Sequence, residues 1–501
     1  MTNQSKERGK VEIRYRSESL NYYERCLNTA VTQEDTQEVI VPDSLPDVSE
    51  ILETGGQTLI RGKDMHLSGV AVSGLSELTV LYRTEGGGLG RLPVDIPFEA
   101  EIACPSTEES SRIVASVRLV SGEARLLNSR KLAVKAEVCV TVTVWVPREL
   151  CWAAEAEAEG CSLEFLRESR VLWPVLAVDE RTFTAEESLP LPGGKPPADS
   201  ILSLRAALRE EEASPVGRKL VVRGTAAVTA VYLSGAGEVA EAEFRLPWSA
   251  FLDLPEGEEA ADWWITTALT GCGAELEEGG GFGVTVGGVV QAALRCRREL
   301  RFLADAYGTD CRFFPEFGAA VLEGESSQDS GTDTVTVRME GLRKPKSFLD
   351  LFADCGRPRQ DRDSVRVPVT VRALCAMEDG GMELLTGRGE AVFPGTGTVP
   401  ELSCGELYAS VTPAGAEVRV PVLFRRSRSA EESLNYLTGG TAEELPEQPG
   451  TPTVTLLRTA EGDTLWSLGK RKGVPCAAIR AYNHLEEGEE PAPGTLLLLA
   501  R

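Results

Sequence analysis

Histidine is almost absent from this sequence, which has only His66 and His484 among its 501 residues. Neither histidine lies in a nucleophile motif, so the sequence gives no basis for Ser-His-Asp or Cys-His catalysis. The glycine-rich stretches 86–90 and 279–283 lack the Gly-Lys-Ser/Thr of a phosphate-binding loop, and we interpret them as turns. We therefore expect a protein that is not an enzyme, with no catalytic residues and no cofactor.

Paired cysteines are also missing. The twelve cysteines are scattered from Cys26 to Cys476, and none forms a Cys-x-x-Cys pair. Together with so few histidines they offer no zinc-binding pattern, so we expect no bound metal. We expect the cysteines to serve as small buried apolar side chains in a reducing cytosol.

Long apolar runs are lacking too. No stretch of about 18 apolar residues occurs, so no membrane-spanning helix is expected. The N-terminal segment, MTNQSKERGK, is charged and no apolar segment follows it, which favours a cytoplasmic protein. Basic residues are outnumbered, and a formal net charge of −25 repels phosphate backbones and anionic lipid heads. Nucleic acid is therefore not an expected partner.

Valine, leucine, alanine and glycine are abundant. Apolar residues make up 42% of the chain, which is enough for packed cores, and 49 glycines fit many strands joined by tight turns. The length favours about three or four domains. Between residues 138 and 146 valine occupies every second position, the period-two pattern of a half-buried strand. We therefore expect a mainly β protein.

The sequence repeats itself at one constant spacing, the spacing that separates Val72 from Val222. The segment 72–84 matches the segment 222–234, and the match extends without a gap from Pro46 to Leu126. The coinciding pairs include Val72/Val222, Gly74/Gly224, Thr79/Thr229, Tyr82/Tyr232, Pro46/Pro196, Pro97/Pro247 and Phe98/Trp248. A chance alignment would not keep this register, so the pattern predicts two copies of one β-rich unit.

A third, shorter copy follows, in which Lys344-Pro345 matches Lys195-Pro196 and the segment 365–374 takes the place of the Val222 segment. We expect three tandem sandwich-like β units, joined by a flexible linker to a small βααβ domain. The linker prediction rests on many Glu, Gly, Thr and Pro residues with few core formers. The expected boundaries are 10–160, 161–310 and 311–427 for the units, 428–452 for the linker and 453–501 for the final domain.

The last segment predicts the order β-α-α-β. Residues 454–458 form the first expected strand, and Asp463 is expected to cap a helix that begins near Thr464. Gly473 is suited to end that helix and Pro475 to open the second one. Residues 478, 479 and 482 supply the apolar stripe of the second helix, and residues 495–499 the closing strand.

This segment resembles the LysM family. The residues that carry the resemblance are Gly462-Asp463-Thr464-Leu465-Trp466, Ser467, Lys470, Gly473-Val474, Tyr482-Asn483, Pro493-Gly494 and Leu496. Two features depart from the family pattern. Gly469 stands where the family usually carries a small helix former, and an acidic insert occupies residues 486–490.

The resemblance implies a ligand site between two loops, because LysM modules bind N-acetylglucosamine glycans there. The implied binding residues are Gly462, Asp463, Thr464, Leu465, Asn483, His484 and Leu485. Several of these residue types also hold turns and helix ends together, so a purely structural role remains open. The basic run Lys470, Arg471, Lys472 is a possible patch for an acidic partner or simply a solvated surface.

The repeat unit resembles the SPOCS domain of spore-coat proteins. The resemblance rests on segments 41–52 and 78–84 and on Asn128-Ser129-Arg130-Lys131 before a valine-rich strand. Such units followed by one LysM module resemble the SipL-like family of spore-coat morphogenesis proteins. This resemblance implies a mother-cell cytoplasmic protein that is recruited to the forespore surface and the spore coat.

The family resemblance also implies a partner, the spore coat morphogenetic ATPase (SpoIVA-like), bound through the LysM module together with other coat proteins. Two alternatives stay open at this point. The first is a peptidoglycan-binding or N-acetylglucosamine-binding protein of the cell wall or cortex. The second is a wall hydrolase targeted by its LysM module, although the β units show no catalytic constellation.

Overall fold

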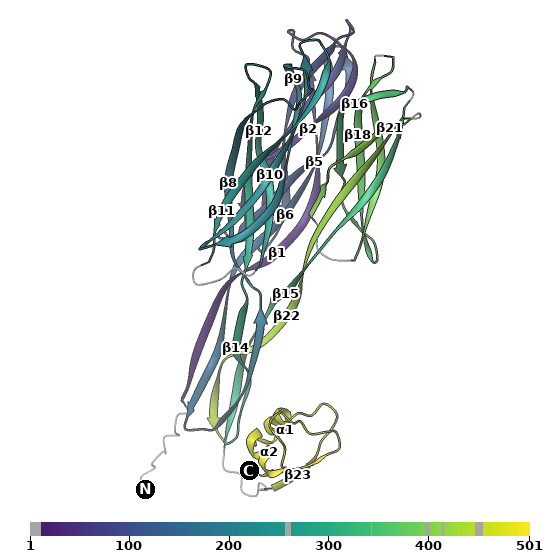
Figure 1. Ribbon diagram of the computed structural model, residues 1–501. Helices are drawn as coiled ribbons and strands as arrows, with labels where there is room; N and C mark the ends of the chain where they lie inside the picture. The colour runs from purple at the N-terminus through teal and green to yellow at the C-terminus, as the bar shows by residue number, and fades with distance from the viewer. Residues whose placement is uncertain are drawn as a thin grey trace.

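The computed structural model describes residues 12–255, 262–341, 343–379, 381–395, 401–412, 415–445 and 454–500. Nearly all of this chain is β-strand in an elongated body, and a small module with two helices lies beside one end (Figure 1). The prediction of a mainly β protein with a small C-terminal βααβ domain is confirmed. Within the described ranges, no helix is long and apolar enough to cross a membrane.

The chain up to Gly308 forms two units. The strands of the first unit are β1 (Glu12–Ile40), β2 (Val48–His66), β3 (Gly69–Thr84), β4 (Leu89–Ala103), β5 (Arg112–Asn128) and β6 (Lys131–Glu159). The strands of the second unit are β7 (Leu163–Leu172), β8 (Val175–Leu189), β9 (Ala198–Val216), β10 (Lys219–Ser234), β11 (Val239–Asp253), β12 (Asp262–Leu276), β13 (Phe282–Arg295) and β14 (Arg298–Gly308).

The remainder forms a third unit and the helical module. The strands of the third unit are β15 (Cys311–Glu340), β16 (Pro345–Cys355), β17 (Arg359–Gln360), β18 (Ser364–Met377), β19 (Met382–Pro394), β20 (Glu401–Cys404), β21 (Tyr408–Thr412) and β22 (Gly415–Glu444). The module consists of β23 (Val454–Arg458), α1 (Leu465–Lys472), α2 (Cys476–Tyr482) and β24 (Leu496–Ala500).

The first two units correspond strand for strand. Strands β2, β3 and β4 begin and end at the sequence-repeat counterparts of the ends of β9, β10 and β11. Each trio is an antiparallel meander whose middle strand pairs on both sides. In the third unit, β16, β18 and β19 form a meander of the same order.

A repeated hydrogen bond explains two of the matched sequence positions. The Tyr82 hydroxyl donates to the carbonyl oxygen of Pro46 at 3.2 Å, and the Tyr232 hydroxyl donates to that of Pro196 at 2.9 Å. Both tyrosine side chains are fully buried. The bond fastens the turn before the first meander strand to the middle strand, so tyrosine and proline recur together.

A close approach explains two further matched pairs. A Cβ atom on Gly74 would lie 2.4 Å from the Phe98 ring, and one on Gly224 would lie 2.4 Å from the Trp248 ring. Both distances are far below van der Waals contact. The aromatic ring on the neighbouring strand therefore requires a glycine beneath it, in both units.

Each unit has its own apolar core between two sheets. In the first unit Val138, Val140, Val142, Val144 and Val146 of β6 are all buried against Val70, Val72 and Phe98 of the meander. The half-buried strand predicted from the valine alternation is therefore present. Separate buried clusters fill the second and the third unit in the same way.

Below these cores the three units share a narrower part, which we call the stalk. It consists of β7, β14 and residues 12–22, 148–159, 311–323 and 431–444 of the four long strands (Figure 1). Its core takes residues from every unit, namely Leu20, Leu150, Trp152, Leu172, Leu300, Phe302, Leu322, Leu434 and Tyr436. Leu300 and Phe302 are the sequence-repeat counterparts of Leu150 and Trp152, so equivalent side chains meet around a common axis.

The three meanders also meet, at what we call the junction. Its apolar part joins Leu52 of the first unit, Leu202 of the second and Leu374 of the third. Beside it lies a buried ion pair between units, in which Arg205 donates to the Asp350 carboxylate at 2.7 Å. The three units therefore meet at the junction and in the stalk, and the first two units are also joined where β1 pairs with β8 in one six-stranded sheet.

The prediction of a flexible linker over 428–452 is wrong for most of its length. Residues 428–444 belong to β22, which pairs with β15 down to the end of the stalk. Leu434 and Leu437 of this segment are buried in the stalk core. The third unit therefore extends to Glu444 rather than ending at residue 427. Residues 446–453 lie outside the described part of the chain.

Candidate functional site

The C-terminal module has a small core of its own. Leu465, Leu468, Val474, Ile479, Leu497 and Leu499 are all buried there. Strands β23 and β24 pair antiparallel, and both helices pack on the same face of this two-stranded sheet. Tyr482, expected in the apolar stripe of α2, is 53% exposed, so that part of the prediction is wrong.

The first loop of the predicted site is held by helix capping. Thr464, not Asp463, is the N-cap of α1, because its hydroxyl accepts from the Ser467 amide while the Ser467 hydroxyl accepts from the Thr464 amide. Asp463 instead accepts from the Ala460 amide at 2.8 Å, and this bond lowers the pKa of Asp463. Gly462 has φ +83°, as the preceding turn requires.

The second loop is anchored by the side chain of Asn483. Its amide group donates to the carbonyl oxygens of Ile479 at 2.7 Å and Leu498 at 2.8 Å, and its oxygen accepts from the Leu498 amide at 2.7 Å. The residue therefore ties the end of α2 to the closing strand. His484 follows in a left-handed conformation with φ 55° and is exposed, while Leu485 packs against the module core.

The two predicted loops are joined by Glu490, a residue of the acidic insert 486–490. The Leu465 amide, at the first turn of α1, donates to the Glu490 carboxylate at 2.7 Å. A carboxylate at a helix N-terminus is favoured by the free amide groups and the helix dipole. The acidic insert 486–490 was the sequence signal for this contact. The sequence could not show that the insert lies against the first turn of α1, because that contact depends on the tertiary structure.

The predicted basic patch is divided by ion pairs. Lys470 contacts Asp305 at 2.7 Å and Arg471 contacts Asp463 at 3.4 Å, whereas Lys472 is exposed. Trp466 also turns toward Asp305, with its indole N–H 2.8 Å from the carboxylate, and its ring packs edge-on against Tyr307. Asp305 and Tyr307 lie on β14, and nothing in the sequence had indicated them.

The described residues hold no group of three or more His, Cys, Asp or Glu side chains that could bind a metal ion. Six of the cysteines are buried and Cys151 is exposed, so the expectation of buried cysteines holds only in part.

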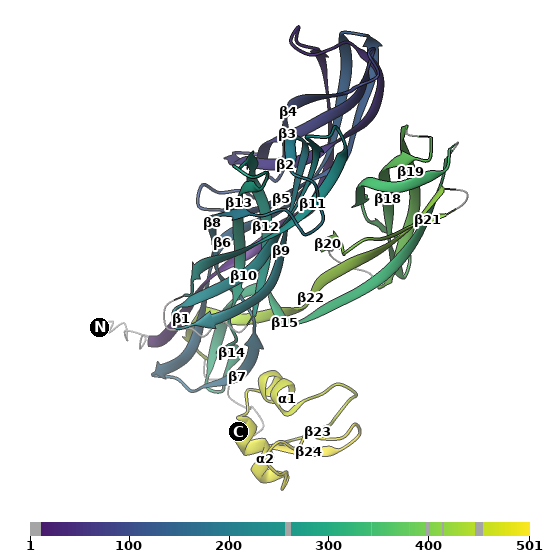
Figure 2. The ribbon, with the colours of Figure 1, turned by 45° about the horizontal axis from the view of Figure 1, so that its top comes forward.

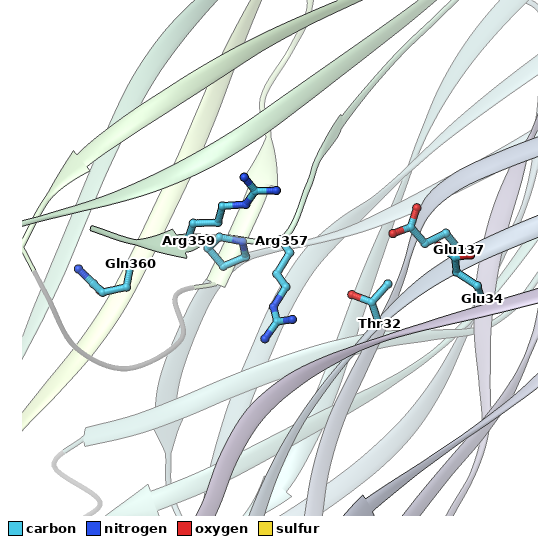
Figure 3. A pocket seen from close by; sticks show the side chains of 7 residues that line it. Thr32, Glu34, Glu137, Arg357, Arg359 and Gln360 are labelled. Carbon is cyan, nitrogen blue, oxygen red and sulfur yellow. The ribbon is translucent and has the colours of Figure 1, made fainter. Parts of the chain in front are cut away.

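A polar cavity of about 790 Å³ lies between the first and third units. Its lining includes Glu34 and Glu137 on one wall and Arg357 and Arg359 on the other (Figure 3).

Comparison with known proteins adds one finding. Residues 458–499 match the LysM domain, and this match supports glycan binding by the C-terminal module. No curated protein and no solved structure matches the chain. The LysM resemblance is therefore confirmed for the module, while the resemblance of the β units rests on their sequence motifs alone.

Proposed function

We propose that this protein is a non-enzymatic scaffold of the spore coat, in which the LysM module recognises a protein partner. The observation that carries the proposal is that polar groups of the two LysM loops already have hydrogen-bond partners within the module. The Leu465 amide, the Thr464 hydroxyl and the Asn483 side chain are already hydrogen-bonded within the module. A partner that meets the outer, charged surface of the module suits this arrangement better than a sugar that needs free loop groups.

The proposed partner is a SpoIVA-like coat ATPase, present in the mother-cell cytoplasm at the forespore surface. This choice is supported by the SPOCS-like motifs of the first unit. Two separate motif segments meet there, because Arg130 donates to the Val41 carbonyl at 3.0 Å and to the Asp47 carboxylate at 2.6 Å. The residues that suggested the family therefore form one structural corner.

Glycan binding is the second candidate function. It is supported by the LysM match over residues 458–499, since modules of this family bind glycans that contain N-acetylglucosamine. In this alternative the protein would attach to peptidoglycan of the cortex or cell wall. The Glu490 carboxylate would then have to leave the Leu465 amide, or the sugar would bind beside it.

One experiment separates the two functions. The full chain and a chain without residues 453–501 are tested for capture by the immobilised coat ATPase and for sedimentation with purified peptidoglycan. We expect ATPase capture of the full chain only, and no retention on peptidoglycan. Retention of the full chain on peptidoglycan without ATPase capture would overturn the scaffold proposal and support the glycan alternative.

A further inference from the structure

The LysM module rests on the second unit through one compact contact, which we call the docking contact. It joins Asp305 and Tyr307 of β14 to Trp466, Lys470 and Val474 of the module. The Asp305 carboxylate accepts from the Trp466 indole at 2.8 Å and from the Lys470 ammonium at 2.7 Å. The Tyr307 hydroxyl donates to the Val474 carbonyl oxygen at 2.8 Å. Figure 2 shows α1 between β14 and the two-stranded sheet of the module.

On the β14 side, the contact is largely sequestered from water. Tyr307 is only 4% exposed, and the side chain of Asp305 is 18% exposed. A half-buried carboxylate with two donors forms charge-assisted hydrogen bonds, which are stronger than those between neutral groups. The edge-on packing of Trp466 against Tyr307, with ring centroids 4.8 Å apart, adds apolar area to the polar bonds.

The module is adapted to this contact at Gly469. A Cβ atom at this position would lie 2.4 Å from the Tyr307 hydroxyl and 2.7 Å from the Val474 carbonyl oxygen. Gly469 is also one of the two departures from the LysM sequence pattern. A glycine in the middle of a short helix costs stability, so a packing reason is expected for it. The close approach of Tyr307 supplies that reason.

The second unit is adapted as well. In the sequence repeat, Asp305 and Tyr307 correspond to Glu155 and Glu157 of the first unit. In the third unit Leu434 takes the place of Leu300 in the stalk core. Counting along the strand from this pair, Gly439 corresponds to Asp305 and Thr441 to Tyr307. Only the second of the three units therefore carries the aspartate and the tyrosine.

We infer that β14 carries a dedicated docking site for the LysM module of the same chain, so that the face of α1 that carries Trp466 is withheld from outside partners while the module is docked. Two matching features carry this inference. Gly469 departs from the LysM sequence pattern, and Asp305 and Tyr307 differ from the residues at the equivalent positions of the other two units. The inference does not depend on whether the module binds a protein or a glycan. A partner that needs Trp466 or Lys470 must first displace the module from β14.

The connection between the stalk and the module favours docking within one chain. β22 ends at Glu444 and β23 begins at Val454, and a connection of this length can span at most about 35 Å. A short tether gives an effective concentration on the order of millimolar, which a second molecule rarely matches. A module from a second copy is the competing arrangement, and the test below distinguishes it.

The test uses the full chain and changes β14 by charge. Asp305→Lys removes both acceptor bonds and places two cations together, and we expect protease cleavage between residues 445 and 453 to become about tenfold faster. The radius of gyration from X-ray scattering should rise at the same time. The pair Asp305→Lys with Lys470→Asp should return part of the wild-type protection.

The matched control is Glu155→Lys, at the equivalent stalk position of the first unit, which should leave cleavage unchanged. Circular dichroism confirms that each variant keeps its β structure. Because a misfolded Asp305→Lys variant would be uninformative, Tyr307→Phe serves as a second, milder variant with a smaller increase in cleavage. A cleavage rate and a radius of gyration that Asp305→Lys leaves unchanged, or a concentration-dependent dimer that Asp305→Lys dissociates, would overturn docking within one chain.

Discussion

A buried carboxyl group at the junction links the stability of the molecule to pH. Glu53 is 5% exposed and lies beside Asp350 and Arg205. Burial and, to a lesser extent, the nearby Asp350 carboxylate raise the pKa of Glu53 to about 7, against the opposing effect of the arginines. The folded state therefore binds a proton that the unfolded chain releases at a lower pH.

The sign of the effect follows from this difference. Because the folded pKa lies above the unfolded value of 4.5, the contribution of Glu53 is complete below that value and is lost as pH rises toward 7. Glu53→Gln should flatten this part of the pH profile and stabilise the protein above pH 7. Thermal unfolding between pH 5 and 8 measures it, with Glu50→Gln on the exposed face of the same strand as control. Equal slopes for wild type and Glu53→Gln would contradict the assignment.

The glycines beneath the aromatic rings give a second prediction at this scale. Gly224→Ala would place a Cβ 2.0 Å from the Arg209 carbonyl oxygen and 2.4 Å from the Trp248 ring, and we expect a loss of about 1–3 kcal/mol in the free energy of unfolding. Gly273→Ala on β12 is the control, because its Cβ meets no atom within 4 Å. Denaturant titration of both variants gives the comparison, and equal midpoints would refute the packing argument.

At the scale of the element, the ends of α1 decide the shape of the LysM loops. Thr464→Ala removes one half of the capping box and should cost about 1 kcal/mol of module stability. Hydrogen exchange at the Ser467 amide reports this loss directly. Faster exchange throughout the three β units would instead indicate a general loss of folding.

Glu490 contributes to the same helix end from the opposite loop. Glu490→Ala should leave the Leu465 amide without its partner and speed its hydrogen exchange, at a cost of about 0.5 kcal/mol. Glu487→Ala, in the same exposed acidic insert, is the control. If glycan binding is the true function, Glu490→Ala should also change retention on peptidoglycan, whereas the scaffold proposal predicts no change.

The sequence predicts local elements well and contacts between distant elements poorly. Cap and turn residues such as Gly473 act within a few positions, so the order of elements in the module could be predicted. The linker was mispredicted because composition alone hid a strand. The segment has few apolar residues, among them Leu434 and Leu437. A strand that pairs along its length with β15 needs only a few such side chains to be held in place. The contact of Asp305 with Trp466 spans 161 positions, and no local pattern encodes it.

At the scale of the whole molecule, the stalk couples the three units. Trp152 is 5% exposed, and its indole donates to the Arg301 carbonyl oxygen of the second unit at 2.9 Å. Trp152→Ala should cost about 3–5 kcal/mol and make the units unfold in separate steps. Phe317→Ala is the control, because Phe317 lies on the stalk at 52% exposure. A single unchanged calorimetric transition for Trp152→Ala would argue against coupling through the stalk.

The long antiparallel strand pairs, β1 with β6 and β15 with β22, also give the molecule a length and a direction. β1 has 29 residues, and at about 3.3 Å per residue it spans up to roughly 95 Å. In the described part of the chain, the LysM module lies beside the stalk end of these long strands. The two ends of the elongated molecule therefore differ, with the meanders at one end and the module at the other. Whatever binds the meander end is held at a set distance from whatever binds the module, and the two attachments cannot exchange places.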